Sequence, residues 1–85
     1  MTENTICTPL RYLMEAANDA FILEQENIEL IVQITVTTAG VSIEAKRYFF
    51  RVRKLVRWEE LETATLNPLS LALMASVHQI YQIPR

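Results

Sequence analysis

The sequence predicts a small α+β domain in which two helices pack on an antiparallel β-hairpin, in the order α-β-β-α. Apolar residues repeat at helical spacing towards both ends of the chain, and between these segments they alternate with polar residues. A single glycine, Gly40, separates two alternating runs and marks the turn of the hairpin. A chain of 85 residues has room for one core, so residues 1–85 are expected to form one domain.

The first predicted helix covers residues 9–25. Thr8 is a suitable N-cap, and Pro9 fits the first helical turn, where its missing N–H is no loss. Apolar residues then recur every three or four positions, and the acidic residues fall mostly outside their stripe. The stripe consists of Leu10, Leu13, Met14, Ala17, Ala20 and Phe21.

The segment NIELIVQITVTT, residues 27–38, has a period of two. Its even-numbered residues from Ile28 to Val36 are apolar, whereas the odd-numbered ones are polar apart from Ile31. Such alternation of β-branched and polar residues predicts a strand that buries its even-numbered face. A turn at Ala39-Gly40 would follow this strand.

The return strand is expected to contain a β-bulge. Pairing across a two-residue loop places the apolar Val32 opposite the charged Arg47. One extra residue near Lys46 restores apolar pairs along the buried face and sets Glu29 opposite Arg51. Two strands alone leave both sheet edges unpaired, so the hairpin is expected to be extended or covered by dimerisation.

The segments after the turn leave one alternative open. The apolar residues of 46–58 also fall on one helical arc, but a helix there would remove the partner of the first strand. The segment EELETATL, residues 59–66, is predicted to be a connecting turn or a short helix. Asn67-Pro68 repeats the combination of a cap and a proline, and predicts a second helix over 68–82.

The second predicted helix carries no charge, because residues 63–84 contain no Asp, Glu, Lys or Arg. A helix that is apolar nearly all round is buried on more than one side. Its apolar run of about 15 residues is too short to span a membrane, which takes about 20. We therefore expect a homodimer with C2 symmetry. The interface candidates are Leu71, Met74, Ala75, His78 and Tyr81.

The segment KRYFFRVRKLVR, residues 46–57, holds six of the eight positive charges of a chain whose net charge is −2. Arginine side chains can bind phosphates, and aromatic rings between them can stack on unpaired bases. KRYFFRVR resembles the aromatic and basic motif of the RNA-recognition fold, but it lacks the glycine of that motif and the βαββαβ order. The interaction candidates are Lys46, Arg47, Phe49, Arg51, Arg53, Lys54, Arg57 and Trp58.

The overall acidity favours a different role for these arginines. All ten acidic residues lie outside 46–57, so carboxylates within the chain or across a dimer are available as partners. A nucleic-acid-binding domain is usually basic as a whole, and an acidic one attracts a polyanion less. Internal or partner pairing is therefore the preferred interpretation, and nucleic-acid binding is the alternative.

Several classes of chemistry lack the residues that they need. One glycine cannot build a P-loop or a dinucleotide-binding fingerprint, and one cysteine with one histidine cannot build a zinc site. Cys7 and His78 lack a third residue to orient them as a nucleophile and base. The carboxylates of Glu59, Glu60 and Glu62 are interpreted as a solvated turn. No catalytic residue, metal or cofactor is predicted.

The sequence thus predicts a non-enzymatic regulatory or adaptor protein that works by protein–protein association, as a homodimer or with another protein. The alternative is a nucleic-acid-binding module that uses residues 46–58, and a small enzyme subunit is a further one. A single cysteine and an N-terminus without the pattern of a signal peptide lead us to expect a cytoplasmic protein that does not enter a membrane.

Overall fold

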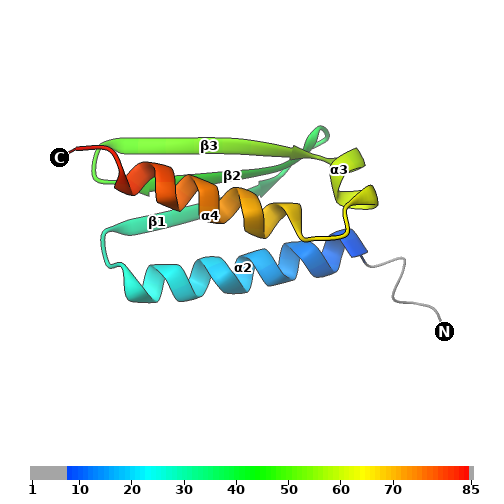
Figure 1. Ribbon diagram of the computed structural model, residues 1–85, viewed down its shortest axis with the longest axis horizontal. Helices are drawn as coiled ribbons and strands as arrows, with labels where there is room; N and C mark the ends of the chain where they lie inside the picture. The colour runs from blue at the N-terminus through cyan, green and yellow to red at the C-terminus, as the bar shows by residue number, and fades with distance from the viewer. Residues whose placement is uncertain (1–7, 85) are drawn as a thin grey trace.

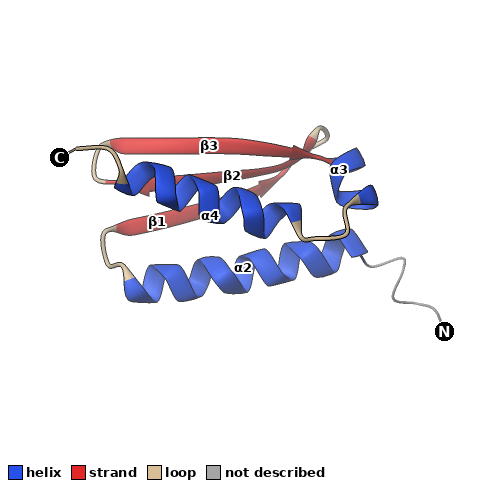
Figure 2. Cartoon of the chain, viewed as in Figure 1, coloured by secondary structure: helices blue, strands red, loops and turns tan. Residues whose placement is uncertain are grey.

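The computed structural model describes residues 8–84, which form an α+β fold with helices on one side of an antiparallel sheet (Figures 1 and 2). The strand order is β1-β2-β3, so β2 is central and the other two strands are edges. The elements are α2 (Thr8–Glu26), β1 (Leu30–Val36), β2 (Gly40–Arg47), β3 (Phe50–Arg57), α3 (Trp58–Thr63) and α4 (Pro68–Tyr81).

The α+β class and both predicted long helices are confirmed. The helix expected over 9–25 is α2, and the helix expected over 68–82 is α4. At the start of α4 the Asn67 side chain accepts hydrogen bonds from the backbone N–H groups of Leu69 at 2.9 Å and Ser70 at 3.3 Å. These bonds satisfy N–H groups that have no partner inside the helix, so Asn67 defines where α4 begins.

The predicted two-stranded hairpin with a bulge near Lys46 is wrong, because the sheet has a third strand. β2 ends at Arg47, the chain turns at Tyr48-Phe49, and β3 runs back along β2. The strand prediction for this stretch is confirmed for 50–57, and the helical alternative is wrong there. The first turn is also displaced. Val32 pairs with Ala45 instead of Arg47, which shifts the register by two residues and needs no bulge.

Gly40 is needed for a different reason from the one predicted. It is the first residue of β2 rather than the tip of a turn, and it lies opposite Arg57 of β3. A Cβ atom at this position would lie 2.1 Å from the carbonyl oxygen of Val56. The turn before it is held by Thr37, whose N–H donates to the Gly40 carbonyl at 2.8 Å. Gly40 therefore allows β3 to approach β2 closely.

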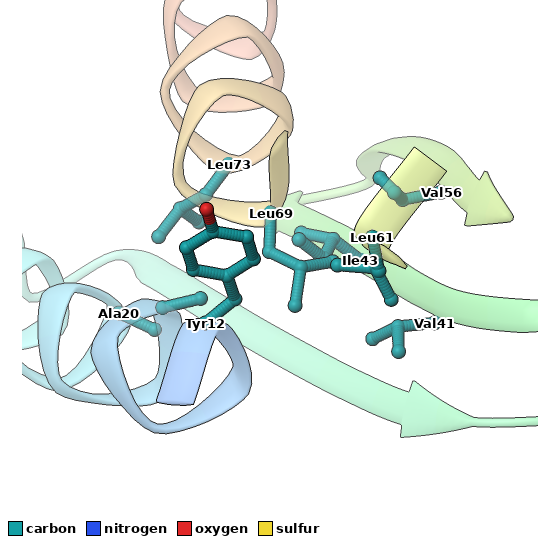
Figure 3. Close-up of a cluster of buried hydrophobic side chains, with 9 residues drawn as sticks. Tyr12, Ala20, Val41, Ile43, Val56, Leu61, Leu69 and Leu73 are labelled. Carbon is teal, nitrogen blue, oxygen red and sulfur yellow. The ribbon is translucent and has the colours of Figure 1, made fainter. Parts of the chain in front are cut away.

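The core lies between the helices and the inner face of the sheet, as Figure 3 shows for one part of it. The Tyr12 ring from α2 lies in a cluster with residues of β2, β3, α3 and α4. Its hydroxyl donates to the Ala64 carbonyl at 3.0 Å. A second cluster lies under the end of α4 and contains Leu30 and Ile80. The residues of the first cluster are Tyr12, Ala16, Ala20, Val41, Ile43, Val56, Leu61, Leu69 and Leu73.

The predicted buried face of β1 is confirmed only at its centre. Leu30 is buried, and Val32 and Ile34 pack against the core while remaining half-buried. Ile28 lies before the strand and is 96% exposed, and Val36 at its other end is 55% exposed. The helices of residues 8–84 therefore cover one face of the sheet, mainly over β2 and β3, and no other described element covers the opposite face.

Candidate functional site

The uncovered face of the sheet, which we call the open face, carries the side chains that alternate with the core residues. A shallow hollow of about 420 Å³ lies on it, lined by two residues each from β1, the β1–β2 turn, β2 and β3. Charged residues gather on β2 and β3, whereas β1 contributes none. The members of the open face are Ile31, Gln33, Thr35, Ser42, Glu44, Lys46, Arg51, Arg53, Leu55 and Arg57.

Glu44 is the only carboxylate of the open face, and it contacts two arginines. Its Oε2 lies 3.3 Å from Nε of Arg51 and 3.8 Å from Nη2 of Arg53, and these ion pairs lack hydrogen-bond geometry. The Glu44 side chain is 12% exposed, whereas those of Arg51 and Arg53 are 58% and 64% exposed. The arginines thus keep most of their surface for a partner even though one carboxylate is near them.

Four of the predicted interaction residues lie on the open face: Lys46, Arg51, Arg53 and Arg57. The ring of Phe49 is fully exposed at the tip of the β2–β3 turn. Within residues 8–84, Lys46 and Arg57 have no carboxylate within 4.0 Å.

The other predicted interaction residues have structural contacts on the helix side or at the corner of the sheet. Lys54 donates to the side-chain oxygen of Gln79 on α4 at 3.4 Å. The Trp58 indole N–H lies 3.1 Å from the carbonyl oxygens of both Thr37 and Thr38, so it holds the β1–β2 turn.

Arg47, the last of these candidates, is buried on the inner side of the sheet, under the end of α4. Its guanidinium carbon lies 4.3 Å from the centre of the Tyr81 ring, and its Nε lies 3.8 Å from Oε2 of Glu29. The Tyr81 hydroxyl donates to the same carboxylate at 2.8 Å. The predicted pair of Glu29 with Arg51 is therefore wrong, because Glu29 lies next to Arg47 and Arg51 pairs with Lys46 of β2. These contacts join α4 to the ends of β1 and β2.

The pKa of Tyr81 is raised above its ordinary value of 10.0 by partial burial, by the hydrogen bond that it gives to Glu29, and by the charge of Glu29. The folded state therefore holds this proton more tightly than the unfolded state. The resulting contribution to stability is complete below about pH 10 and is lost as the pH rises through the folded pKa.

A Tyr81→Phe variant tests this coupling. At pH 8 we expect it to lower the free energy of unfolding by about 1 kcal/mol, because the hydrogen bond to Glu29 is lost. The difference from the wild type should shrink above about pH 10, because the wild-type tyrosine is then ionised and repels Glu29. Urea denaturation of both proteins between pH 8 and 11 measures this. A difference that stays constant over that range would contradict the prediction.

The outer side of the helices forms a second surface, the helical outer face. Leu71 and Met74 of α4 are 59% and 54% exposed, although they are large and apolar. Ile22 of α2 is 45% exposed and lines an apolar depression together with Met74. We define this face as Ile22, Leu71, Met74, Ala75 and His78, which are all exposed.

Tyr81, the remaining predicted interface residue, does not belong to the helical outer face, because it packs on Arg47. Within residues 8–84 of one chain, α4 is buried on one side only, so burial of its outer side by dimerisation stays a prediction. Its inner residues Leu69, Leu73 and Ile80 are buried, and its outer residues are exposed. The absence of charge in residues 63–84 extends to this outer side, which is apolar and uncovered within residues 8–84.

Sequence reasoning missed the roles of Glu44 and Glu24. The signal for Glu44 was its position in the strand, since it shares its parity with Lys46 and lies on the same face. Glu24 of α2 accepts a hydrogen bond from the backbone N–H of Val32 at 2.7 Å, so it covers part of the β1 edge. This contact depends on how α2 packs against β1, and no local pattern indicates it.

The chemistry candidates gain no support from their positions. Glu59, Glu60 and Glu62 are exposed on the short helix α3, and Cys7 lies outside the described residues. In the described range 8–84, no group of three or more His, Cys, Asp or Glu residues is placed to hold a metal ion. None of the helices in this range is long and apolar enough to cross a membrane.

Comparison with known proteins adds no family. No protein-family model matches the sequence, and no match was found among curated proteins or among solved structures.

Proposed function

We propose that this protein is a non-enzymatic regulatory or adaptor protein that acts by protein–protein association, and that it forms a homodimer through the helical outer face. The observation that carries the proposal is a face of α4 that is exposed, apolar and without charge. Leu71 and Met74 are 59% and 54% exposed, whereas the apolar core residues of the same helix are fully buried. Burying such a face is favourable by about 25 cal/mol per Å² of apolar surface.

A second copy of the chain is the partner that this face suits. The α4 part of this face presents no formal charge with which to select a charged protein, because residues 63–84 carry none. An isologous C2 contact places the same apolar residues against each other and requires only that they match themselves. Asp19 of α2, which lines the same depression as Ile22 and Met74, would contribute to the polar rim that such interfaces have.

The edges of the sheet are less suited to self-association. Pairing β3 with β3 of another copy would place rows of arginines beside each other, and like charges opposite each other destabilise a sheet. At the other edge, the outward N–H of Val32 already donates a hydrogen bond to the Glu24 carboxylate. Of the two routes to a dimer that the sequence suggested, contact between the helices is therefore favoured over contact between edges.

A Leu71→Glu variant tests the proposal. Two charges would meet across the interface, so we expect the wild type to be a dimer at micromolar concentration and the variant to have the 9.8 kDa mass of one chain. Sedimentation equilibrium measures both masses. Ile31→Glu is the matched control, because Ile31 is 56% exposed on the open face, and it should remain a dimer. A wild type with the mass of one chain would refute the proposal.

Nucleic-acid binding through the open face is the alternative. It is favoured by the fully exposed ring of Phe49, which lies at the tip of the strands that carry Lys46 and Arg51. Single-stranded nucleic acids stack on such rings and track basic grooves. Glu44 weakens this alternative, because it places a negative charge between Arg51 and Arg53.

A further inference from the structure

The two edges of the sheet differ in whether their outward backbone groups are occupied. In an antiparallel pair, alternate residues of an edge strand point their N–H and C=O groups at the neighbour and the others point outward. The bond from Thr37 N–H to Gly40 O shows that odd-numbered residues of β1 point at β2. In the β1–β2 register these residues pair with even-numbered residues of β2, so the backbone groups of odd-numbered β2 residues point at β3. The odd-numbered β2 residues lie opposite even-numbered residues of β3, so the N–H and C=O groups of the odd-numbered β3 residues point outward.

At the β1 edge, outward N–H groups have partners within the fold. The Leu30 N–H donates to the Asn27 carbonyl at 2.9 Å, and the Val32 N–H donates to the Glu24 carboxylate at 2.7 Å. A partner strand would have to displace Glu24 before it could pair there. This edge is therefore guarded, as natural sheets commonly are.

At the β3 edge, the outward N–H groups of Arg51, Arg53 and Leu55 have no hydrogen-bond partner among residues 8–84. Figure 1 shows β3 as the outermost strand of the sheet, with no element beyond it on that side. The carbonyl groups of the same residues alternate with these N–H groups. They present the spacing of donors and acceptors that the backbone of another strand can match.

β3 carries basic side chains on both faces of the sheet. Arg51, Arg53 and Arg57 lie on the open face, and Lys54 lies on the helix side. Residues 50–57 contain no acidic residue. A partner strand beside β3 would therefore lie within reach of several cationic groups, and among residues 8–84 Glu44 is the one carboxylate within 4.0 Å of any of them.

We propose that the β3 edge binds an extended acidic segment of a partner protein as a fourth strand. The segment's backbone would pair with Arg51, Arg53 and Leu55, and its Asp or Glu residues, at alternate positions, would meet the arginines of the open face. This surface is at the sheet edge and the helical outer face is on the helices, so the inference goes beyond the proposed dimer and does not depend on it.

The same arginines also disfavour pairing of β3 with β3 of another copy, and charged side chains are a common protection of sheet edges. Protection alone and recognition of an acidic strand make different demands. Protection requires only charge on the edge. Recognition requires that the outward backbone groups are accessible and that a segment of opposite charge gains hydrogen bonds from them. An experiment that separates backbone pairing from charge therefore decides between them.

The probe is a fluorescein-labelled peptide of about ten residues in which Glu alternates with Thr, long enough to pair with one strand. A second peptide has the same side chains but N-methyl groups on the amides that would pair with β3. We expect the first peptide to bind, and the second to bind at least about tenfold more weakly, because several hydrogen bonds are lost while the charge is kept. Fluorescence anisotropy measures both affinities.

Matched variants locate the site. Arg53→Gln removes one charge at the edge, and we expect it to weaken binding of the acidic peptide by about tenfold. Arg11→Gln removes one charge on α2, where the Arg11 side chain is 57% exposed, and should leave the affinity unchanged. Amide hydrogen exchange should slow at Arg51, Arg53 and Leu55 when the peptide binds, because these N–H groups become hydrogen-bonded.

Three results would overturn the inference: no binding of the acidic peptide, equal affinities for the normal and the N-methylated peptides, or tighter binding of a single-stranded oligonucleotide of equal charge. The second would show that charge alone attracts the peptide. The third would assign the open face to nucleic acid, and that complex should also weaken steeply with salt. The mass of the protein in solution does not enter any of these results, so failure of the proposed dimer would be recognised separately.

Discussion

Gly40→Ala is expected to lower the free energy of unfolding by about 3 kcal/mol or more, which is a large part of the stability of a domain of this size. The new Cβ atom would lie 2.1 Å from the Val56 carbonyl oxygen and 2.8 Å from the Arg57 Cα. Both are backbone atoms, so no side-chain rotation can relieve the clash. Relief requires β3 to move away from β2, and the pairing of Gly40 with Arg57 would be lost.

Urea denaturation followed by circular dichroism measures the loss. Ser42→Ala is the matched control, because Ser42 lies on the same strand and its side chain already has a Cβ atom on the open face. Its effect should stay within about 0.5 kcal/mol. If Gly40→Ala were as stable as the control, the close approach of β3 to β2 at this point would be wrong.

Val32→Asp is expected to be nearly as damaging, whereas Thr35→Asp is expected to be tolerated. Val32 packs against both core clusters, and its N–H donates to Glu24. A carboxylate there would lose its hydration and would lie beside another carboxylate, at a cost of about 3 kcal/mol or more. Thr35 is exposed on the open face, where Asp costs about 1 kcal/mol or less through its low strand preference.

Thermal unfolding of the two variants checks the assignment of the faces of β1. The comparison is direct because the substitutions introduce the same residue into the same strand, at positions of opposite parity. Similar melting temperatures would mean that β1 does not bury its even-numbered side. A larger loss for Thr35→Asp than for Val32→Asp would mean that the helices cover the other face of the sheet.

The helices were predictable because their signals are local. A cap and a proline start α4, and the apolar spacing of α2 and α4 needs no knowledge of distant residues. The α+β class follows from these helices and from the alternation in β1. Local patterns of this kind depend on residues a few positions apart, which is the range over which a helix or a strand chooses its inward face.

The third strand was not predictable from the turn that creates it. Tyr48-Phe49 contains none of the residues that usually form two-residue turns, and Tyr48 has a φ of 58°, a conformation that favours Gly or Asn. Without that turn, the residues after Gly40 form a single return strand, which needs a bulge near Lys46 to restore its register. The inward residues of β2 and β3 pack against α4, and this packing requires the chain to reverse at Tyr48-Phe49.

The candidate surfaces were predictable only where they depend on local sequence patterns. The exposed Leu71 and Met74 were selected from the lack of charge in their helix, but the open face depends on which residues of β2 and β3 are neighbours. Glu44 contacts Arg51 and Arg53 only because the chain reverses between them. The inward position of Arg47 likewise follows from the register of β1 with β2, which places it opposite Leu30.

The contact of Trp58 with the β1–β2 turn makes tryptophan fluorescence an intrinsic probe of folding in this protein. Trp58 is the only tryptophan, and its indole N–H bridges the carbonyl groups of Thr37 and Thr38 from the far end of β3. Its emission is therefore sensitive to whether the first hairpin and the third strand have come together at that corner. Because these segments are about twenty residues apart in the chain, the fluorescence follows a non-local step of folding rather than the formation of either helix.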